Sequence, residues 1–242
     1  MKKQPNFLNR FCMTQICLLF VIVTTIGIVS AQNDKPQKEE RYEKDIVAYE
    51  EQSQKTPPPE GCTMFVGSST WRLWGKELEQ DFAEFKAVNR GFGGSTIPDV
   101  LRVMHRIVLP HKPARIMFFC GGNDIAGGAT GDETFKNFKT FIKRVWDDNP
   151  STDVFFVSVT IAPSRARFRD ETSKYNAQVK ELAEKTPHLY YVDTYSTLVG
   201  DDGVAQEKYF LNDRLHLNKE GHDRWIPVIK KAINDVENTH SH

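Results

Sequence analysis

Five short apolar runs alternate with longer amphipathic stretches, and this alternation limits the possible folds more than any other feature of the chain. The runs lie at 62–67, 86–90, 114–120, 153–160 and 189–193. Helical periodicity predicts helices at about 72–84, 96–109, 132–148, 170–186 and 218–236. Short apolar strands separated by helices are typical of a parallel sheet covered on both faces. We therefore expect an α/β fold, a three-layer α/β/α sandwich with five parallel strands in flavodoxin-like order.

The length and composition suit a single globular domain with an N-terminal appendage. The chain has 242 residues, of which 39% are hydrophobic and 26% are charged. We assign the domain to 61–238 and a linker with one helix to 32–60. The helical pattern of this appendage covers 39–55 and ends before Pro57, which stops a helix.

The first 31 residues have the organisation of a secretory signal peptide. Lys2, Lys3 and Arg10 precede an apolar stretch at 11–29, and small residues end this stretch at Ala31. The alternative is an uncleaved membrane anchor, because the stretch is about as long as a short spanning helix. Its threonines, glycine and small terminal residues favour cleavage. We expect a secreted or periplasmic protein with no stable membrane insertion after the signal peptide (1–31) is removed.

The charge of the chain argues against a nucleic-acid partner. The full sequence carries 32 basic and 32 acidic side chains. Three of the basic ones and none of the acidic ones belong to the signal peptide, which leaves 29 against 32 in the remainder. Binding to nucleic acid requires a concentrated basic patch, and the sequence contains none. The sequence predicts no particular oligomeric state.

Two cysteines, Cys62 and Cys120, remain after the signal peptide, and an exported protein with two cysteines invites a disulfide. The strand pattern argues against it, since Cys62 begins one predicted strand and Cys120 ends another that is parallel to it. A disulfide requires Cα atoms about 4.4–6.8 Å apart. We predict two buried free thiols.

A nucleophile, a base and an acid lie near the two ends of the predicted domain. Ser69 follows the first apolar run, which places it at the C-terminal end of a strand. Asp213 precedes His216 by three residues, a spacing that lets the carboxylate bind the imidazole Nδ1–H and leaves Nε2 free to take a serine proton. In a doubly wound sheet the site lies beyond the carboxyl ends of the strands. Ser69 and the Asp213–His216 pair are therefore expected at one edge of the sheet.

Two further segments offer hydrogen-bond donors, which acyl transfer needs for the developing oxyanion. Gly93 and Gly94 follow the second predicted strand, and glycine lets a backbone amide approach a ligand closely. Asn123 follows the third strand with a side-chain amide. Each motif alone is typical of an ordinary turn or cap. Their occurrence after successive strands favours one shared site.

The segments GSST, GFGGST, GGND and DRLH, in this order and spacing, resemble the blocks whose Ser, Gly, Asn and His give the SGNH (GDSL-type) hydrolase superfamily its name. The resemblance extends over about 61–236. It implies an α/β/α sandwich that hydrolyses esters through an acyl-serine intermediate, with no metal and no cofactor.

The resemblance assigns a role to each residue of the site. Ser69 is the nucleophile, and His216 and Asp213 complete the catalytic triad. The oxyanion hole consists of the Ser69 N–H, the Gly94 N–H and the Asn123 side chain.

The sequence departs from the family pattern at Ser68, where the family usually has Asp. That Asp is not the nucleophile, so activity is still expected, but the hydrogen bonding around the turn must differ. Ser68 is itself a hydroxyl. Strand alternation and alignment with the family both favour Ser69 as the nucleophile.

Candidate substrate-binding residues flank the predicted site. Trp71 follows the nucleophile by two positions and is expected beside the acyl pocket, whereas Trp74 is expected in the core. Arg165 and Arg167 lie in a loop near the same edge, where they would recognise an acidic or hydroxyl-rich leaving group. A solvated charged loop is the slightly favoured alternative for these arginines.

Two further polar residues invite a functional interpretation. His222 follows His216 by six residues, which would suit a metal pair, but a surface position at the start of a helix is favoured. Asp193 closes the fifth apolar run and is interpreted as a structural hydrogen-bonding residue instead of a second catalytic acid.

Together these features predict an exported serine esterase that removes a short acyl group, above all acetyl, from a carbohydrate or lipid alcohol. The short acyl chain rests on the resemblance to platelet-activating-factor acetylhydrolase subunits and bacterial carbohydrate acetylesterases. A lysophospholipase and a sugar O-acetyltransferase are alternatives at the same site. A non-catalytic envelope protein that binds glycans is an alternative of another class.

Overall fold

The computed structural model describes residues 34–240. Its contacts divide the chain into two compact units, Met1–Glu43 and Lys44–His242. The first helix, α1 (Asp34–Lys55), crosses this division and ends before Pro57, as predicted. The description below concerns the second unit. The signal peptide predicted at the N-terminus lies outside the described residues.

Five parallel strands form the sheet, as the alternation of apolar runs predicts. They are β1 (Thr63–Gly67), β2 (Ala87–Gly91), β3 (Arg115–Phe119), β4 (Asp153–Val157) and β5 (Leu189–Val192). Their order is β2-β1-β3-β4-β5, which is flavodoxin-like. Gly67 pairs in register with Gly91 of β2 and with Phe119 of β3. Three neighbouring strands therefore end at the same edge.

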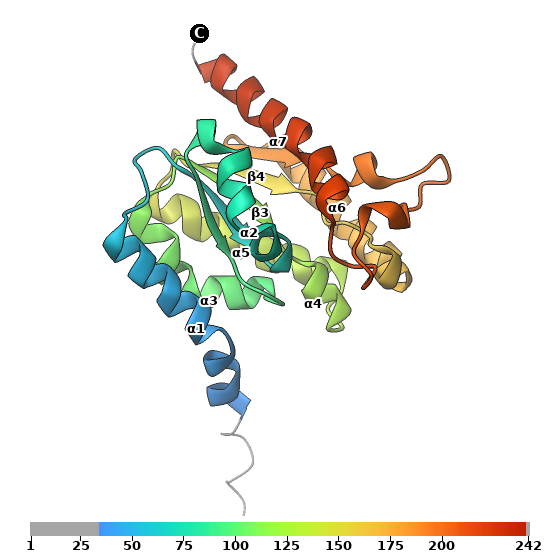
Figure 1. Ribbon diagram of the computed structural model, residues 1–242, viewed down its shortest axis with the longest axis horizontal. Helices are drawn as coiled ribbons and strands as arrows, with labels where there is room; N and C mark the ends of the chain where they lie inside the picture. Colours follow the sequence, from blue (N-terminus) through green and yellow to red (C-terminus); the bar gives the residue numbers. More distant parts are fainter. Residues whose placement is uncertain (1–33, 241–242) are drawn as a thin grey trace, which may run out of the picture. The chain divides into compact units, whose positions relative to one another are not determined.

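Helices cover both faces of the sheet and complete the predicted three layers (Figure 1). They are α2 (Ser69–Asp81), α3 (Ile97–Ile107), α4 (Gly122–Ala126), α5 (Gly131–Asp148), α6 (Arg169–Ala183) and α7 (Lys219–His240). The 3-10 turns are η1 (Ala83–Phe85), η2 (Leu109–His111), η3 (Pro163–Phe168), η4 (Tyr195–Leu198) and η5 (Glu207–Tyr209). Periodicity did not predict α4 or these turns, because they are too short to show it. Within the described part of the chain, no helix has the length and apolar character needed to cross a membrane.

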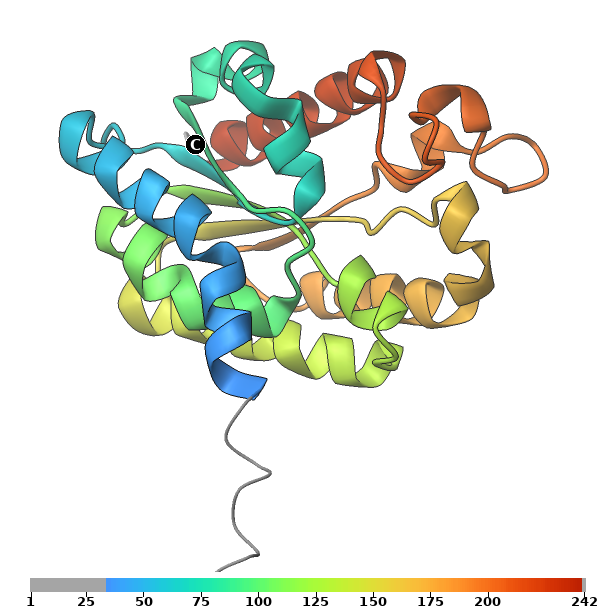
Figure 2. The ribbon, with the colours of Figure 1, turned by 60° about the horizontal axis from the view of Figure 1, so that its bottom comes forward.

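The strand side chains alternate between two apolar layers. Phe65, Met117 and Phe155 belong to one buried cluster with Trp71 of α2 and Trp225 of α7. The opposite face packs on α3, α5 and α6 (Figure 2). Aromatic rings of β3 and β4 contact rings of α5 and α6 on this face. Burying one such side chain stabilises the fold by about 1.5–3 kcal/mol. The core therefore lies on both sides of the sheet and leaves its carboxyl edge for a site.

Helix α2 begins three residues earlier than its helical pattern predicts. Gly67 ends β1 and Ser68 is the N-cap, so the chain changes from strand to helix within two residues. Gly75, with φ of +67°, interrupts the helical conformation further along. The early start places Ser69 in the first turn of α2, at the carboxyl edge of the sheet.

Cys62 and Cys120 are both buried and free, as predicted. Burial raises the pKa of each thiol above its ordinary value. Cys62 precedes β1 and Cys120 follows β3, so the two thiols belong to opposite ends of neighbouring strands. Both behave as core residues.

Candidate active site

A glycine makes possible the turn that presents Ser69. Gly67 has φ of +145°, and a Cβ at this position would lie 2.0 Å from the Phe119 carbonyl oxygen. The next N–H, that of Ser68, donates to the same oxygen (3.1 Å). The end of β1 can therefore approach β3 this closely only with glycine, and the approach orients the first turn of α2.

The segment 213–216 forms a tight turn around one carboxylate. Asp213 Oδ1 accepts the N–H groups of Leu215 (2.9 Å) and His216 (3.0 Å), and Oδ2 accepts His216 Nδ1–H (2.6 Å). Arg214 allows the turn with a left-handed φ of +56°. Desolvation raises the pKa of Asp213, but these hydrogen bonds outweigh it and lower the pKa to about 2. The carboxylate is ionised at neutral pH and orients the imidazole.

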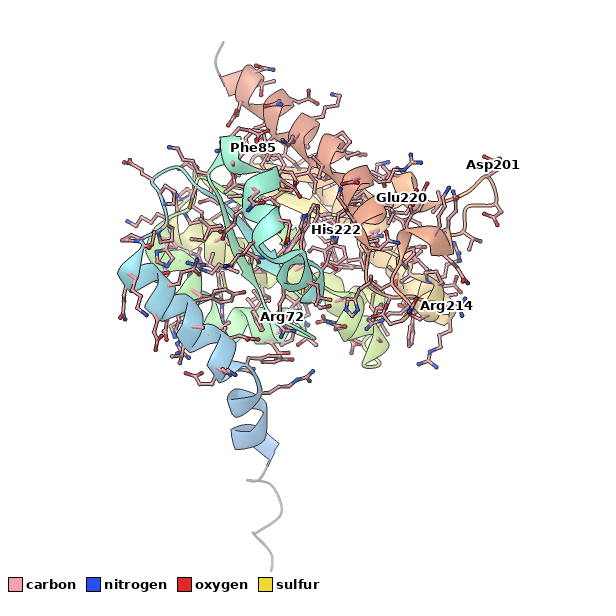
Figure 3. The ribbon with its side chains drawn as sticks, in the orientation of Figure 1. Arg72, Phe85, Asp201, Arg214, Glu220 and His222 are labelled. Atoms are coloured by element: carbon pink, nitrogen blue, oxygen red, sulfur yellow. The ribbon has the colours of Figure 1, made fainter. Side chains whose placement is uncertain are left out.

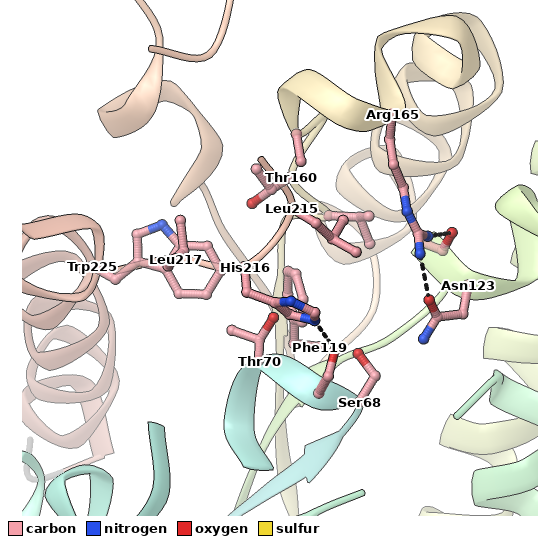
Figure 4. Close-up of a pocket in the computed structure, with 14 residues that line it drawn as sticks. Ser68, Thr70, Phe119, Asn123, Thr160, Arg165, Leu215, His216, Leu217 and Trp225 are labelled. Atoms are coloured by element: carbon pink, nitrogen blue, oxygen red, sulfur yellow. Dashed lines mark hydrogen bonds between the residues drawn. The ribbon is translucent and has the colours of Figure 1, made fainter. Parts of the chain in front are cut away.

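Ser69 Oγ lies 2.9 Å from His216 Nε2, although the two residues are 147 positions apart (Figure 4). The structure therefore brings the predicted Asp213, His216 and Ser69 into one hydrogen-bonded chain. With Nδ1–H donated to the carboxylate, Nε2 is free to accept the serine proton. This arrangement can activate the hydroxyl and return the proton to a leaving group.

Buried Ser95 joins the glycine turn to the rest of the site. Its hydroxyl donates to the Gly67 carbonyl (3.1 Å), and its own carbonyl accepts from Asn123 Nδ2 (3.0 Å). The Phe92 N–H donates to the same Gly67 oxygen (3.1 Å). Sequence reasoning missed this residue. Its position beside Gly94 in the GFGGST motif was the available signal, but the contacts depend on the fold.

The predicted oxyanion donors are partly assembled around a pocket. Ser69 and Asn123 line it, whereas Gly94 does not. The Ser69 N–H belongs to the first turn of α2, where N–H groups have no intrahelical partner. Asn123 Nδ2 carries a second N–H besides the one bound to Ser95. Gly94 has φ of +75°. It is joined to Asn123 through the neighbouring Ser95, whose carbonyl accepts from Asn123 Nδ2.

The pocket beside Ser69 is small and has two chemically different sides. Its cavity volume is about 50 Å³. Phe119, Leu217 and Trp225 form an apolar side, and Asn123 and Arg165 lie on the other (Figure 4). On the same measure a water molecule needs about 10–15 Å³. The cavity therefore has room for a small group of a few non-hydrogen atoms.

The prediction that Trp71 lies beside the acyl pocket is wrong. Its side chain is fully buried and packs against Phe65, Trp74 and Trp225 in the core. The cause is the early start of α2, which turns the second residue after the nucleophile toward the sheet. Trp74 is in the core, as predicted. Sequence reasoning missed Trp225 as the pocket tryptophan, because helical periodicity indicates only that it is buried.

The two candidate arginines have different surroundings. Arg165 is half-buried and lines the pocket, where it donates to the Gly122 carbonyl and to Asn123 Oδ1 (2.8 Å). Arg167 is exposed, does not line the pocket, and lies over the Phe168 ring at 4.6 Å. A solvated loop describes Arg167 but not Arg165.

His222 lies in the first turn of α7, so the helix-start position predicted for it is confirmed, but the residue is half-buried and not on the open surface. Its ring stacks on Trp74 with 4.1 Å between centroids and 6° between planes, where α7 packs against α2 (Figure 3). Desolvation lowers its pKa to about 4. No group of three or more His, Cys, Asp or Glu side chains within residues 34–240 is arranged to hold a metal ion.

Asp193 caps a turn as predicted, since Oδ1 accepts the Ser196 N–H (3.2 Å).

Ser68 lies in the pocket wall but outside the hydrogen-bonded chain. The residue is 7% exposed, and its side chain makes no capping hydrogen bond to α2. Ser69, and not Ser68, contacts His216. The geometry therefore agrees with the choice of Ser69 as the candidate nucleophile.

The doubly wound sheet, with a Ser–His–Asp chain at its carboxyl edge, defines the class of SGNH-type α/β/α sandwiches. The chain belongs to the GDSL-like lipase/acylhydrolase family, whose model matches residues 59–224. The matched segment contains all five strands and the candidate site. Membership of this family implies an ester hydrolase.

Solved structures share the fold. A Bacteroides fragilis protein described provisionally as an acylhydrolase is 26% identical, with a TM-score of 0.69 over 78% of this chain and 95% of that one. A GDSL-like lipase from Bacteroides thetaiotaomicron is 23% identical, with a TM-score of 0.66 over 81% and 97%. A variant of an acetyl-xylooligosaccharide esterase from Geobacillus is 17% identical, with a TM-score of 0.58 over 72% and 94%. No curated protein matches the chain.

Proposed function

We propose that the protein is an exported serine esterase that removes a short acyl group, above all acetyl, from a carbohydrate or lipid alcohol. The observation that carries the proposal is the hydrogen-bonded chain from Asp213 through His216 to Ser69. This chain ends beside a small cavity that the amide of Asn123 also borders. The predicted signal peptide at 1–31 supports export.

The mechanism follows from the order of these contacts. His216 Nε2 takes the Ser69 proton as Oγ attacks the ester carbonyl, and ionised Asp213 stabilises the imidazolium. The oxyanion accepts hydrogen bonds from the Ser69 N–H and Asn123 Nδ2–H. The family resemblance adds the Gly94 N–H as a third donor, although Gly94 does not line the cavity. His216 then protonates the leaving alcohol. Water, activated by the same imidazole, hydrolyses the acyl-Ser69 ester.

The pocket supports a short acyl group and a polar alcohol. Its volume of about 50 Å³ suits an acetyl group, and apolar Phe119, Leu217 and Trp225 provide a surface for the methyl. Arg165 and Asn123 provide hydrogen-bonding groups for a hydroxyl-rich leaving group. The Geobacillus structural neighbour, a variant of an acetyl-xylooligosaccharide esterase, is consistent with a carbohydrate ester.

The test compares wild type with Ser69→Ala on p-nitrophenyl acetate and octanoate. Each is expressed with its full N-terminus and recovered outside the cytoplasm, where mass spectrometry is expected to show a chain beginning at Gln32. We expect kcat/KM on acetate to fall on the order of 10³-fold or more, because the nucleophile is removed. Ser68→Ala is the matched control, since its hydroxyl lies in the same pocket but does not contact His216. This control should keep activity within a few-fold of wild type.

Equal rates for wild type and Ser69→Ala would contradict the serine mechanism. A preference for octanoate would contradict the short acyl chain. Acetylated sugars, xylan fragments and lysophospholipids then distinguish the natural substrate class. Turnover of lysophospholipids alone would favour the lysophospholipase alternative.

A further inference from the structure

Arg165 places a cation in the wall of the pocket. Its two hydrogen-bond acceptors are both on α4: the carbonyl oxygen of Gly122 and Oδ1 of Asn123. Within residues 34–240, no acidic side chain forms an ion pair with it. Burial lowers the pKa of the guanidinium, so this position has an electrostatic cost. Such a cost at the edge of a candidate active site points to a role.

The hydrogen bonds of Asn123 fix which way its carboxamide faces. Oδ1 accepts from Arg165 (2.8 Å), and Nδ2 donates to the Ser95 carbonyl (3.0 Å). Because a guanidinium can only donate, it excludes the flipped orientation in which Nδ2 would face Arg165. The second N–H of Nδ2 therefore remains for a ligand in the pocket. Figure 4 shows Asn123 held from its oxygen end by Arg165.

A cation bound to an amide oxygen also strengthens the amide as a donor. It draws electron density toward oxygen, so the N–H groups become more positive and form stronger hydrogen bonds. The effect is largest where charge develops on the acceptor, as on the oxyanion of acyl transfer.

The 3-10 turn that carries Arg165 also contacts the other half of the site. The Ser164 N–H donates to the Arg214 carbonyl (3.0 Å), in the turn between Asp213 and His216. The η3 segment is therefore held against the acid–base turn, and Arg165 extends from it to α4. Its position is set independently of any substrate.

We infer that Arg165 is a positioning residue for the oxyanion hole: it holds and polarises the Asn123 carboxamide, whose free N–H stabilises the developing negative charge. This inference rests on the proposed esterase function. It differs from recognition of an acidic leaving group, because Arg165 then acts through Asn123 on every ester, including neutral ones.

The experiment is a double-mutant cycle on the neutral ester p-nitrophenyl acetate, with Arg165→Met, Asn123→Ala and the double variant. We expect Arg165→Met to lower kcat about tenfold to a hundredfold with KM nearly unchanged, less than loss of a whole oxyanion donor. In the Asn123→Ala background the same change should cost less than about twofold, because its only route to the oxyanion is gone. Affinity for a trifluoromethyl ketone that forms a tetrahedral adduct should fall in parallel with kcat.

Two variants control for the loss of a positive charge or of folding. Arg167→Met removes a cation from the same turn that does not line the pocket, and it should leave kcat unchanged. Arg165→Lys keeps the charge and one donor toward Asn123, so it should recover part of the kcat that Arg165→Met loses. It also replaces Arg165→Met as the test variant if Arg165→Met is poorly folded.

Equal fold-losses in both backgrounds would overturn the inference. So would a loss confined to KM or to anionic esters, which would instead show direct binding of substrate. Failure of the proposed function has a separate signature, since Ser69→Ala would then be as active as wild type.

Discussion

At the scale of single residues, the candidate site depends on neighbours that perform no chemistry. Gly67 permits the turn before the nucleophile, and its carbonyl accepts from Phe92 and Ser95. Ser95 in turn accepts from Asn123. Two backbone oxygens, those of Gly67 and Ser95, and the buried Ser95 hydroxyl therefore join the nucleophile, glycine and asparagine motifs.

Gly67→Ala should destabilise the protein strongly. The new methyl would lie 2.0 Å from the Phe119 carbonyl oxygen, and φ of +145° is unfavourable for alanine. We expect the free energy of unfolding to fall by at least about 3 kcal/mol, measured by urea denaturation. Gly128→Ala is the control, because φ there is +103° but no atom lies within 4 Å of the new methyl. A similar loss in both variants would show that backbone strain, and not the contact with β3, makes Gly67 necessary.

Single residues also mark the limits of prediction from the sequence. Ser69, Asp213 and His216 were predictable, because their residue types and spacing are typical of a nucleophile with its base and acid. Trp71 and Trp225 are both buried tryptophans on helices, and the sequence does not distinguish a core position from a pocket wall. The difference depends on the angle at which each helix leaves or approaches the sheet.

At the scale of elements, residues 44–55 of α1 are bound to the edge of the sheet that carries the glycine turn. Tyr49 Oη donates to the Gly91 carbonyl at the end of β2 (2.5 Å). Buried Arg90 of β2 donates to Ser53 Oγ (2.7 Å), and its guanidinium lies 5.0 Å from the Tyr49 ring centroid. The family model begins at residue 59. This helix therefore adds support from outside the matched domain.

Tyr49→Phe should lower the free energy of unfolding by about 1 kcal/mol, because it removes one partly buried hydrogen bond and keeps the ring. Burial raises the pKa of Tyr49 to about 12, so the phenol donates throughout the neutral range. Chemical denaturation at pH 7 measures the loss. Tyr195→Phe is the control, since its hydroxyl forms an exposed bond to Gly203 (3.3 Å) and its loss should be within about 0.5 kcal/mol. Equal effects would show that the Tyr49 hydrogen bond adds no more stability than an exposed one.

At the scale of the whole molecule, the contact of α7 with α2 makes stability depend on pH. In the unfolded chain His222 binds a proton below the ordinary histidine pKa of 6.5. In the folded protein desolvation lowers this pKa to about 4, so the proton binds only near pH 4. Stability should therefore fall as the pH decreases from about 6.5 to about 4, with no contribution from this group above that range. At about 1.4 kcal/mol per pH unit the limit is about 3 kcal/mol. Partial exposure reduces the expected loss to about 1–2 kcal/mol.

His222→Phe isolates this contribution, because it keeps an aromatic ring on Trp74 and cannot titrate. Urea unfolding of both proteins at several pH values between 4 and 7.5 should show a smaller decrease for the variant. Other titrating groups, including His111, are present in both proteins and cancel in the difference. Parallel pH profiles would contradict the assignment.

The whole fold was more predictable than the details of its site. Five apolar runs with intervening helices lead to a parallel sheet, because each pattern is local and repeated. The strand order rests on a further rule, the right-handed crossover between parallel strands. The short α4 and the 3-10 turns were not predictable, and α4 with η3 supplies the Asn123–Arg165 contact. Elements of three to six residues leave no period, and their conformation is decided by the longer elements that they connect.

The sequence by itself determined the chemistry available to this protein: a serine at a strand end, an Asp and His three residues apart, a glycine turn and an asparagine. It also determined the sheet that brings them to one edge, since side-chain period and turn residues act over a few positions. Only the tertiary structure decided that Ser69 contacts His216, that Trp225 lines the pocket and Trp71 does not, and that Arg165 holds Asn123. These outcomes depend on packing between segments far apart in the chain, which local sequence patterns do not determine.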